Sequence, residues 1–268
     1  MAVLKNDIDY AGSVGNKSYY KRRDIPGKTF VREKGGASWK KIKTSKSFVN
    51  TRKFNKEFGG CSKAGTAVRK ALYPLRHMAD YNISTSLNSI AKKIQKMDST
   101  GLLGQRIITF SKYKQWLDGF SYNKQKPISG VVQSPFYFSI VREEGKATVK
   151  IPALVPNINF QNKYNNPLVR FTVTLGILTD FIYNPDRDEY VSKNPDVQSK
   201  NSSATTGWQS AFMPVAEESL TLQLDSSLLD DEANTLILAL GIEFGNPLTN
   251  TLVEQIKYSG SAIILGTA

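Results

Sequence analysis

The sequence predicts a mainly β chain, in which an antiparallel β-sandwich of about seven to nine strands follows a basic hairpin arm and a short helical hairpin. From about residue 106 onward, short β-type runs alternate with Gly, Pro and Asn. Apolar residues with helical spacing precede them, between residues 61 and 98. The first 60 residues are polar, basic and rich in Gly. Strands do not alternate with helices, which argues against a doubly wound nucleotide-binding fold.

The first predicted region, residues 1–60, is a basic arm that contains a β-hairpin. Ser18–Lys21 and Lys28–Arg32 flank Pro26–Gly27, where Pro fixes φ and Gly tolerates a positive φ, so a turn is expected there. A second basic stretch, from Lys40 to Lys56, is interleaved with aromatic residues. Because the arm has too few apolar residues for a core, we interpret it as an element that packs on something else.

The second predicted region, residues 61–100, is a helical hairpin. We expect Ser62 to cap a helix that Pro74 bends or ends. A second helix is expected from about Ser84 or Ser86, with one buried and one cationic face. Its apolar positions are Leu87, Ile90, Ala91, Ile94 and Met97, and its cationic ones are Lys92, Lys93 and Lys96.

The third predicted region, residues 101–268, holds the sandwich. Residues 185–206 are rich in Asn, Asp and Ser and predict a long exposed loop. We expect the terminal apolar run to complete its own sheet, with donation to a neighbouring copy as the alternative. The expected strands are Arg106–Phe110, Gly130–Gln133, Phe136–Val141, Ala147–Ile151, Val169–Leu178, Phe181–Tyr183, Leu220–Leu224, Thr235–Phe244 and Ala262–Leu265.

Charge is divided unevenly along the chain. Residues 1–150 hold 30 of the 36 Lys and Arg but 10 of the 23 Asp and Glu, a net formal charge of +20. Residues 151–268 hold the other 6 bases and 13 acids, a net of −7. A basic half suits nucleic acid, another anionic surface, or the acidic half of a second copy.

No motif for catalysis or nucleotide binding is complete. Gly60–Thr66 departs from a P-loop because Thr66 stands where the Lys is required, and a tight turn with a helix cap is the simpler interpretation. An anion at that helix start, beside Ser62 and Lys63, is the alternative. His77 and Cys61 are the only residues of their types and lie about four helical turns apart, so we expect His77 to be a helix-terminal or core residue.

The sequence therefore predicts a protein that is not an enzyme, with no cofactor, metal site or small-molecule substrate. The acidic runs Asp186–Glu189 and Asp230–Glu232 lack the spacing of a calcium-binding EF-hand loop. No apolar run approaches the ~20 residues of a membrane span, so no membrane insertion is expected. The N-terminus lacks a signal-type apolar stretch, which predicts cytoplasmic synthesis, with incorporation into an assembled particle left open.

The cations of the basic arm are interleaved with aromatic residues, a pattern that suits either single-stranded nucleic acid or a partner's sheet and acidic loops. The simplest alternative is a basic face exposed to solvent. The acidic runs supply the expected docking surface, at Asp186, Asp188, Glu189, Asp230, Asp231 and Glu232. The expected partner-binding or nucleic-acid-binding residues are Tyr19, Tyr20, Lys21, Arg22, Arg23, Trp39, Lys40, Lys41, Lys43, Arg52, Lys53, Lys63, Lys92, Lys93 and Lys96.

Three features of the N-terminal quarter resemble a group of uncharacterised bacterial proteins with a Gly-x-x-Gly-Asn opening and a basic N-terminal region. They are Gly12–Tyr20, the Lys34–Gly36 turn and the Glu57–Gly60 turn. The resemblance implies no activity and transfers no functional residue.

We expect a non-enzymatic structural subunit that self-assembles into a filament or particle. The basic arm of one copy would dock on the acidic β-sandwich of the next, and such a head-to-tail contact gives a ring or an open filament. Burial of the aromatic residues would supply most of the affinity. Electrostatic attraction would fix the register of the two copies. The alternative is a protein that binds DNA or RNA through the arm and the Lys-rich helix face.

Overall fold

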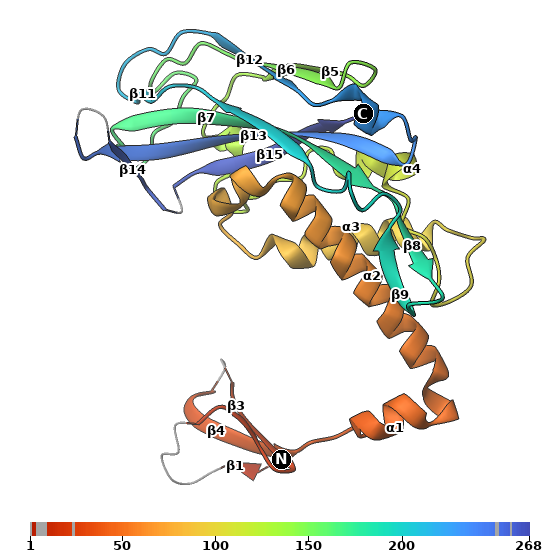
Figure 1. Cartoon of the computed structure of the whole chain (residues 1–268). Coiled ribbons are helices and arrows are strands. Elements are labelled where there is room, and N and C mark those ends of the chain that lie inside the picture. The colour runs from red at the N-terminus through yellow and green to blue at the C-terminus, as the bar shows by residue number, and fades with distance from the viewer. Residues whose placement is uncertain (1, 4–9, 23–24, 250–251, 258) are drawn as a thin grey trace. The chain divides into compact units, whose positions relative to one another are not determined.

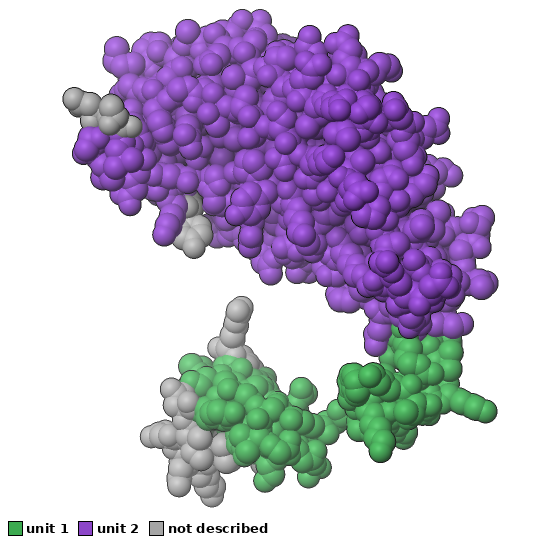
Figure 2. Space-filling model, in the orientation of Figure 1, with its two compact units in different colours: residues 1–52 green, residues 53–268 purple. Residues whose placement is uncertain are grey.

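The computed structural model describes residues 2–3, 10–22, 25–249, 252–257 and 259–268 (Figure 1). The chain divides into two compact units, residues 1–52 and residues 53–268 (Figure 2). The chain is mainly β, with antiparallel sheets and a helical region, as the sequence predicts. Its described strands fall into four sheets.

The N-terminal unit is a small antiparallel sheet followed by short helices. The sheet has the order β1-β4-β3-β2. In the described part of this unit only Thr29 and Phe30 are buried, so the sheet has almost no core. The elements are β1 Ala2–Val3, β2 Gly12–Val14, β3 Lys17–Arg22, β4 Ile25–Glu33, α1 Trp39–Thr44 and the 3₁₀ turn η1 Lys46–Phe48.

The predicted hairpin is present as β3 and β4, but its turn lies elsewhere. Arg22 pairs with Ile25, so Pro26 and Gly27 belong to β4 rather than to the turn. The register shifts between Lys21 and Arg22, and Gly27 has a φ of 77°. Proline is tolerated at such an irregularity because it has no N–H to give to the ladder. The Pro-Gly pair therefore marks a bulge in the strand.

The body begins with two helices joined by a 3₁₀ segment, and they form the helical region that the sequence predicts. The expected start at Ser62 is wrong, because the first helix begins near Val49 and Ser62 lies well inside it. Pro74 falls in the 3₁₀ segment after that helix, as expected. The helices are α2 Val49–Ala71, η2 Tyr73–Met78 and α3 Ile83–Lys96; shorter pieces are α4 Phe110–Tyr113, η3 Lys114–Trp116, η4 Ile128–Gly130 and η5 Ser226–Leu229.

The remaining strands form a six-stranded, a three-stranded and a two-stranded antiparallel sheet. In the first, β7 Leu168–Thr179 and β13 Asn234–Pro247 pair along twelve positions. The others of that sheet are β10 Asn201–Thr205, β11 Gln209–Ser210, β14 Val253–Gln255 and β15 Ser261–Thr267. The smaller sheets are β5 Tyr137–Val141, β6 Lys146–Ile151 and β12 Glu218–Gln223, and β8 Phe181–Asn184 with β9 Glu189–Ser192.

The central strand β13 is apolar on both faces because it separates two cores. Leu238 and Leu240 face the core shared with β6 and β12. Ile237 and Ala239 face the core shared with α2 and α3. Gly176 on β7 lets α2 approach closely, since an added Cβ would lie 2.7 Å from the Ala71 carbonyl oxygen. The helices thus cover one face of the six-stranded sheet (Figure 1).

Three expectations about local structure need correction. Arg106–Phe110 and Gly130–Gln133 are not strands; each contributes one isolated bridge, at Ile108 and at Val132. The expected loop 185–206 instead contains β9 and β10. Polar side chains suit β10 because it is an edge strand with exposed positions. The terminal run forms β15 and pairs with β13 of its own sheet, as expected.

Candidate functional site

Aromatic and cationic side chains of the N-terminal unit stack on one another. Tyr20 and Phe30 are directly opposed on β3 and β4, and their rings stack at 5.8 Å between centroids. The guanidinium of Arg32 lies 5.5 Å from the Tyr20 ring centre, and that of Arg22 lies 5.5 Å from Phe30. These cation–π contacts hold both arginines on the surface of the sheet. Two expected site residues, Tyr20 and Arg22, therefore share one face.

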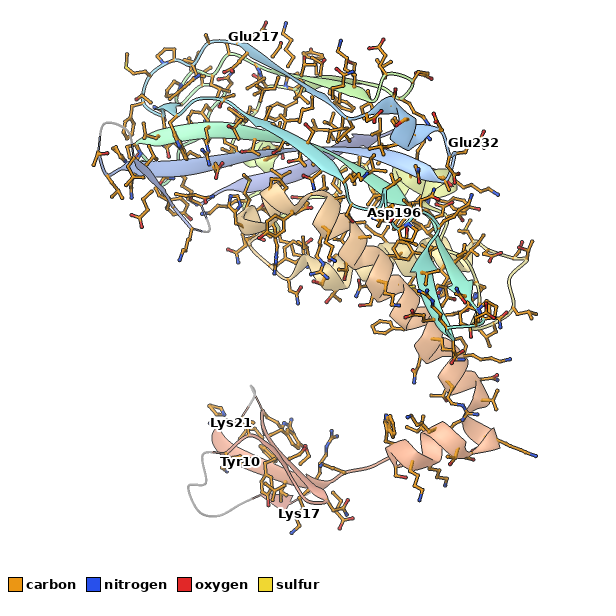
Figure 3. All side chains as sticks on the ribbon, in the orientation of Figure 1. Tyr10, Lys17, Lys21, Asp196, Glu217 and Glu232 are labelled. Carbon is orange, nitrogen blue, oxygen red and sulfur yellow. The ribbon has the colours of Figure 1, made fainter. Side chains whose placement is uncertain are left out.

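Tyr19 lies on the other face of β3, because neighbouring residues of a strand point to opposite sides. It meets Tyr10 edge to face at 5.7 Å, beside Val31 on β4. Lys21 is exposed on this strand, and Figure 3 shows it at the sheet with Lys17 and Tyr10. Arg23 lies outside the described residues. The expected aromatic pair Tyr19–Tyr20 is thus split between two faces.

Helix α1 presents the most exposed aromatic side chain of the N-terminal unit. Trp39 is 69% exposed, and the Lys43 Nζ lies 3.8 Å from its ring centre. The spacing of four residues places both on one helix face. Lys40 and Lys41 are exposed, and Ser38 caps the helix by accepting a hydrogen bond from the Lys41 N–H. No residue of α1 is buried, and Ile42 is its only partly buried one.

Arg52 has a structural contact instead of an open binding position. Its Nη1 donates to the carbonyl oxygens of Ile42 and Ser45, at 2.7 and 2.9 Å. It thereby satisfies carbonyl groups at the end of α1. Lys53, the next residue, is exposed on α2.

The expected cationic helix face is divided by its partners. Lys63 pairs with Glu189 at 2.5 Å, and Lys92 pairs with Glu57 at 2.7 Å. Lys93 lies over the ring of Trp116, 5.8 Å from its centre. Lys96 is exposed. The structure therefore does not gather Lys92, Lys93 and Lys96 into one cationic surface.

Sequence reasoning missed the buried carboxylate of Glu57, whose side chain is 0% exposed. Its Oε1 accepts hydrogen bonds from the Gly104 N–H at 3.0 Å and the Arg106 Nε at 2.7 Å. Its Oε2 accepts from the Arg106 Nη2 at 2.6 Å and the Lys92 Nζ at 2.7 Å. Burial alone would raise the pKa of Glu57, but these donors outweigh it and lower the pKa to about 2. The available sequence signal was spacing: Glu57 lies four residues before Cys61, so the two fall on the same face of a helix.

A second missed carboxylate, Glu243, lies on the helix side of β13. It accepts hydrogen bonds from Arg170 at 2.6 Å, Thr172 at 3.1 Å and Gln255 at 2.5 Å, and it pairs with His77 at 3.1 Å. Burial alone would raise the pKa of Glu243, but the contacts of His77 and Arg170 outweigh it and lower that pKa. A lone charge inside an otherwise apolar strand was the available signal. His77 is helix-terminal, in agreement with expectation.

The alternative anion site at Gly60–Thr66 is closed, and Cys61 is inaccessible. Gly60–Thr66 lies inside α2, so its backbone N–H groups belong to the helix and do not form an anion site. Cys61 is fully buried, and burial raises the pKa of its thiol to about 11. A thiol with so high a pKa is a poor nucleophile at neutral pH.

Half of the expected acidic docking surface is paired with bases of the same chain. Asp188 pairs with Lys56 and also accepts a hydrogen bond from Tyr183. Asp231 meets Lys193 at 3.4 Å. Glu189 is held by Lys63, as described above. Within the described part of the chain, Asp186, Asp230 and Glu232 have no ion pair, and Figure 3 places Glu232 on the body apart from Asp196 and Glu217.

A polar cleft of about 480 Å³ lies beside the start of β13. Lys112, Lys114 and Lys193 line it together with Asp180 and Glu232. Burial raises the pKa of Asp180, although Ser111 donates two hydrogen bonds that oppose the rise. The lining residues of this cleft include neither His nor Cys and present both signs of charge.

Within the described residues, no group of three His, Cys, Asp or Glu side chains is placed to hold a metal ion. None of the described helices is long and apolar enough to cross a membrane. No protein-family model and no curated protein matches the chain. The resemblance at the N-terminal quarter stays a prediction.

Proposed function

We propose that the chain is a non-enzymatic structural subunit that assembles with copies of itself through its N-terminal unit. One observation supports this most directly: the described part of that unit buries only Thr29 and Phe30, yet it exposes Trp39 and holds stacked aromatic and cationic side chains. Ordering a residue costs about 1–2 kcal/mol of conformational entropy, which so small a core does not offset. A partner that covers these side chains would supply the missing burial.

In this proposal, charge plays a smaller part in docking than the division of charge along the sequence predicts. The N-terminal unit carries 13 Lys and Arg against 4 Asp and Glu, a net formal charge of +9, whereas the body carries 23 against 19, a net of +4. Both units are thus cationic, and Asp188, Glu189 and Asp231 already have partners. Aromatic burial then supplies the affinity, and charge contributes only locally, through acids such as Asp230 and Glu232.

In this proposal the six-stranded and three-stranded sheets of the body form the β-sandwich on which the neighbouring copy docks. Their facing strands share a continuous apolar core, which supports that interpretation. The filament or particle is the expected product.

Binding of DNA or RNA is the second candidate, and the charge of the N-terminal unit favours it. Thirteen bases in 52 residues, with an exposed Trp39, suit a phosphate backbone and stacked bases. Affinity for nucleic acid falls steeply with salt because bound counterions are released. Assembly through aromatic burial depends on salt far less.

Light scattering after size-exclusion chromatography of nuclease-treated protein, at low and high salt, separates the two candidates. Oligomers or filaments without nucleic acid support assembly. Trp39→Ala is expected to reduce them at least tenfold, whereas Tyr73→Ala, which removes a 62% exposed ring from the body, leaves them unchanged. A monomer that shifts only when DNA or RNA is added overturns the assembly proposal and supports the second candidate.

A further inference from the structure

Strand β5 is an edge strand with one side open. Its residues Tyr137–Val141 pair with β6 along five uninterrupted positions. Among the described residues, no backbone hydrogen bond is recorded on its outer side. Edge strands expose N–H and C=O groups that pair readily with another strand.

Two other edges of the body, β15 and β10, differ from β5. The segment 119–122 covers β15, where the Tyr122 N–H donates to the Ala262 carbonyl and the Ile264 N–H to the Phe120 carbonyl. Strand β10 is made of small, mostly polar residues, and β12 lies beside it. Strand β5 reads Tyr-Phe-Ser-Ile-Val and contains no charge, Pro, Gly or bulge, which are the devices that keep edges apart.

Its side chains are also exposed to an unusual degree for their chemistry. Tyr137 is 65% exposed, Phe138 is 44% exposed and Val141 is 37% exposed. An edge that combines open backbone groups with exposed apolar side chains gains from both hydrogen bonding and burial when another strand joins it.

We propose that β5 pairs antiparallel with β5 of a second copy, about a two-fold axis at Ser139. In this register Tyr137 lies opposite Val141 of the other copy and Phe138 lies opposite Ile140. Apolar side chains therefore meet apolar ones throughout, and no like charges face each other. The three-stranded sheets of two copies become one continuous six-stranded sheet, and the contact is the same on both copies.

Charge near the ends of β5 is compatible with the antiparallel direction, although part of it is already paired within the chain. The turn after β5 carries Glu143 and Glu144, of which Glu144 meets Lys146 at 3.9 Å, while Lys150 on β6, paired with Glu217 at 2.8 Å, lies beside Tyr137 at the other end of the strand. Antiparallel pairing brings the acidic turn of each copy toward the lysine end of the other. A parallel arrangement would bring the two acidic turns together.

This inference rests on the proposed function only in treating the chain as one that assembles with copies of itself. It uses a surface of the body and is independent of the N-terminal unit. A two-fold contact at β5 combined with a head-to-tail contact through the N-terminal unit would link dimers into an open array.

Cysteine cross-linking of the full chain tests the register directly. The only native cysteine, Cys61, is fully buried and leaves the background low. Ser139→Cys is expected to give at least tenfold more disulfide-linked dimer than Thr221→Cys under mild oxidation. Thr221 is the matched control because it is exposed in the same row, opposite Thr148, on β12 at the other edge of the three-stranded sheet.

A second pair of variants fixes the register. Tyr137→Cys alone is expected not to cross-link, since the two copies of residue 137 would lie ~14 Å apart, beyond the ~7 Å limit between Cα atoms for a disulfide. A mixture of Tyr137→Cys and Val141→Cys is expected to cross-link. Equal yields from Ser139→Cys and Thr221→Cys overturn the proposal.

Charge at the axis gives an independent measurement. Ser139→Lys places two cations opposite each other and is expected to weaken dimerisation at least tenfold in sedimentation, whereas Thr221→Lys is expected to leave it unchanged. Dimerisation that Ser139→Lys leaves intact contradicts the β5 contact. If Trp39→Ala still abolishes assembly in that case, the proposed function stands and only the β5 pairing is wrong. If Ser139→Cys cross-links but Trp39→Ala has no effect on assembly, the β5 pairing stands and docking through the N-terminal unit is wrong.

Discussion

The N-terminal unit holds its cations above almost no core, whereas the body places several of its charges in buried or paired positions. In the unit, Trp39 and Lys43 contact each other with no residue of their helix buried beneath them. In the body, Lys92 and Arg106 converge on the buried Glu57. The same residue types are therefore exposed without a core in one region and support the interior in the other.

The largest expected difference between the two regions is in amide hydrogen exchange. Amides of β7 and β13 are flanked by two cores, while β3 and β4 have only Thr29 and Phe30 buried between them. At a concentration where the chain is monomeric, β7 and β13 are expected to exchange at least ~10³-fold more slowly, which corresponds to about 4 kcal/mol. Equal protection in the monomer would show that the N-terminal unit is stable alone and would remove the main support for docking.

Removal of the Glu57 charge is expected to have the next largest effect. Glu57→Gln leaves Arg106 and Lys92 partly buried without their counter-charge, and breaking such a pair costs about 3–5 kcal/mol of unfolding free energy. Urea denaturation measures the loss. Glu189→Gln is the matched control, because it removes the same charge from the exposed pair with Lys63 and is expected to cause no measurable change. A loss below about 1 kcal/mol would show that the network does not support the fold.

The pH dependence of stability gives a separate check on the same carboxylate. The folded-state pKa of Glu57, about 2, lies below its ordinary value of 4.5. Its contribution is therefore complete above pH 4.5 and is lost as the pH falls toward 2. Denaturation at several pH values is expected to show a stability that falls over this range in the native chain and falls less steeply in Glu57→Gln. Identical slopes would contradict the assignment.

Much of the fold was predictable from residue pattern, but the partners of the charges were not. The apolar run through Leu238 and Leu240 predicts a buried strand, because an apolar residue on each face requires a layer on each side. The helix start was missed because Gly59–Gly60 resembles a turn. Gly60 instead lies where α2 touches Tyr190, and that contact is made across 130 residues of sequence.

The predicted binding residues do not form one surface, because their contacts also involve residues far apart in the sequence. Helical spacing correctly separates Lys92 from the apolar face of α3, but it cannot show that Glu57 lies close enough to bind that lysine. Asp188 and Glu189 were expected to bind the basic arm of another copy. Sequence alone does not reveal that β8 and β9 pack beside α2, where lysines of the same chain pair with both acids. Trp39, Lys40 and Lys41 are exposed, and no residue of their helix is buried.

The neighbouring glycines of α2 offer a sharper test of packing, with a smaller effect. A Cβ at Gly60 would lie 2.5 Å from the Tyr190 ring, whereas a Cβ at Gly59 meets nothing within 4 Å. Gly60→Ala is expected to destabilise the fold by about 1–3 kcal/mol, since the close contact must open. Gly59→Ala is expected to stabilise it by about 0.5–1 kcal/mol through helix propensity. Thermal denaturation of both variants checks the opposite signs, and a shared sign would refute the close contact between α2 and Tyr190.

The smallest effect is expected at the exposed pair of Asp188 and Lys56, where solvent screens the attraction. Asp188 has a φ of 52°, a conformation that Asn tolerates well, so Asp188→Asn removes the charge without straining the backbone. Urea denaturation at low and high salt is expected to show no measurable change from the native chain. A clear loss of stability that salt abolishes would show that this surface pair supports the β8–β9 hairpin on α2. The contrast between the two units would then be weaker, because an ion pair exposed to solvent would also stabilise the body.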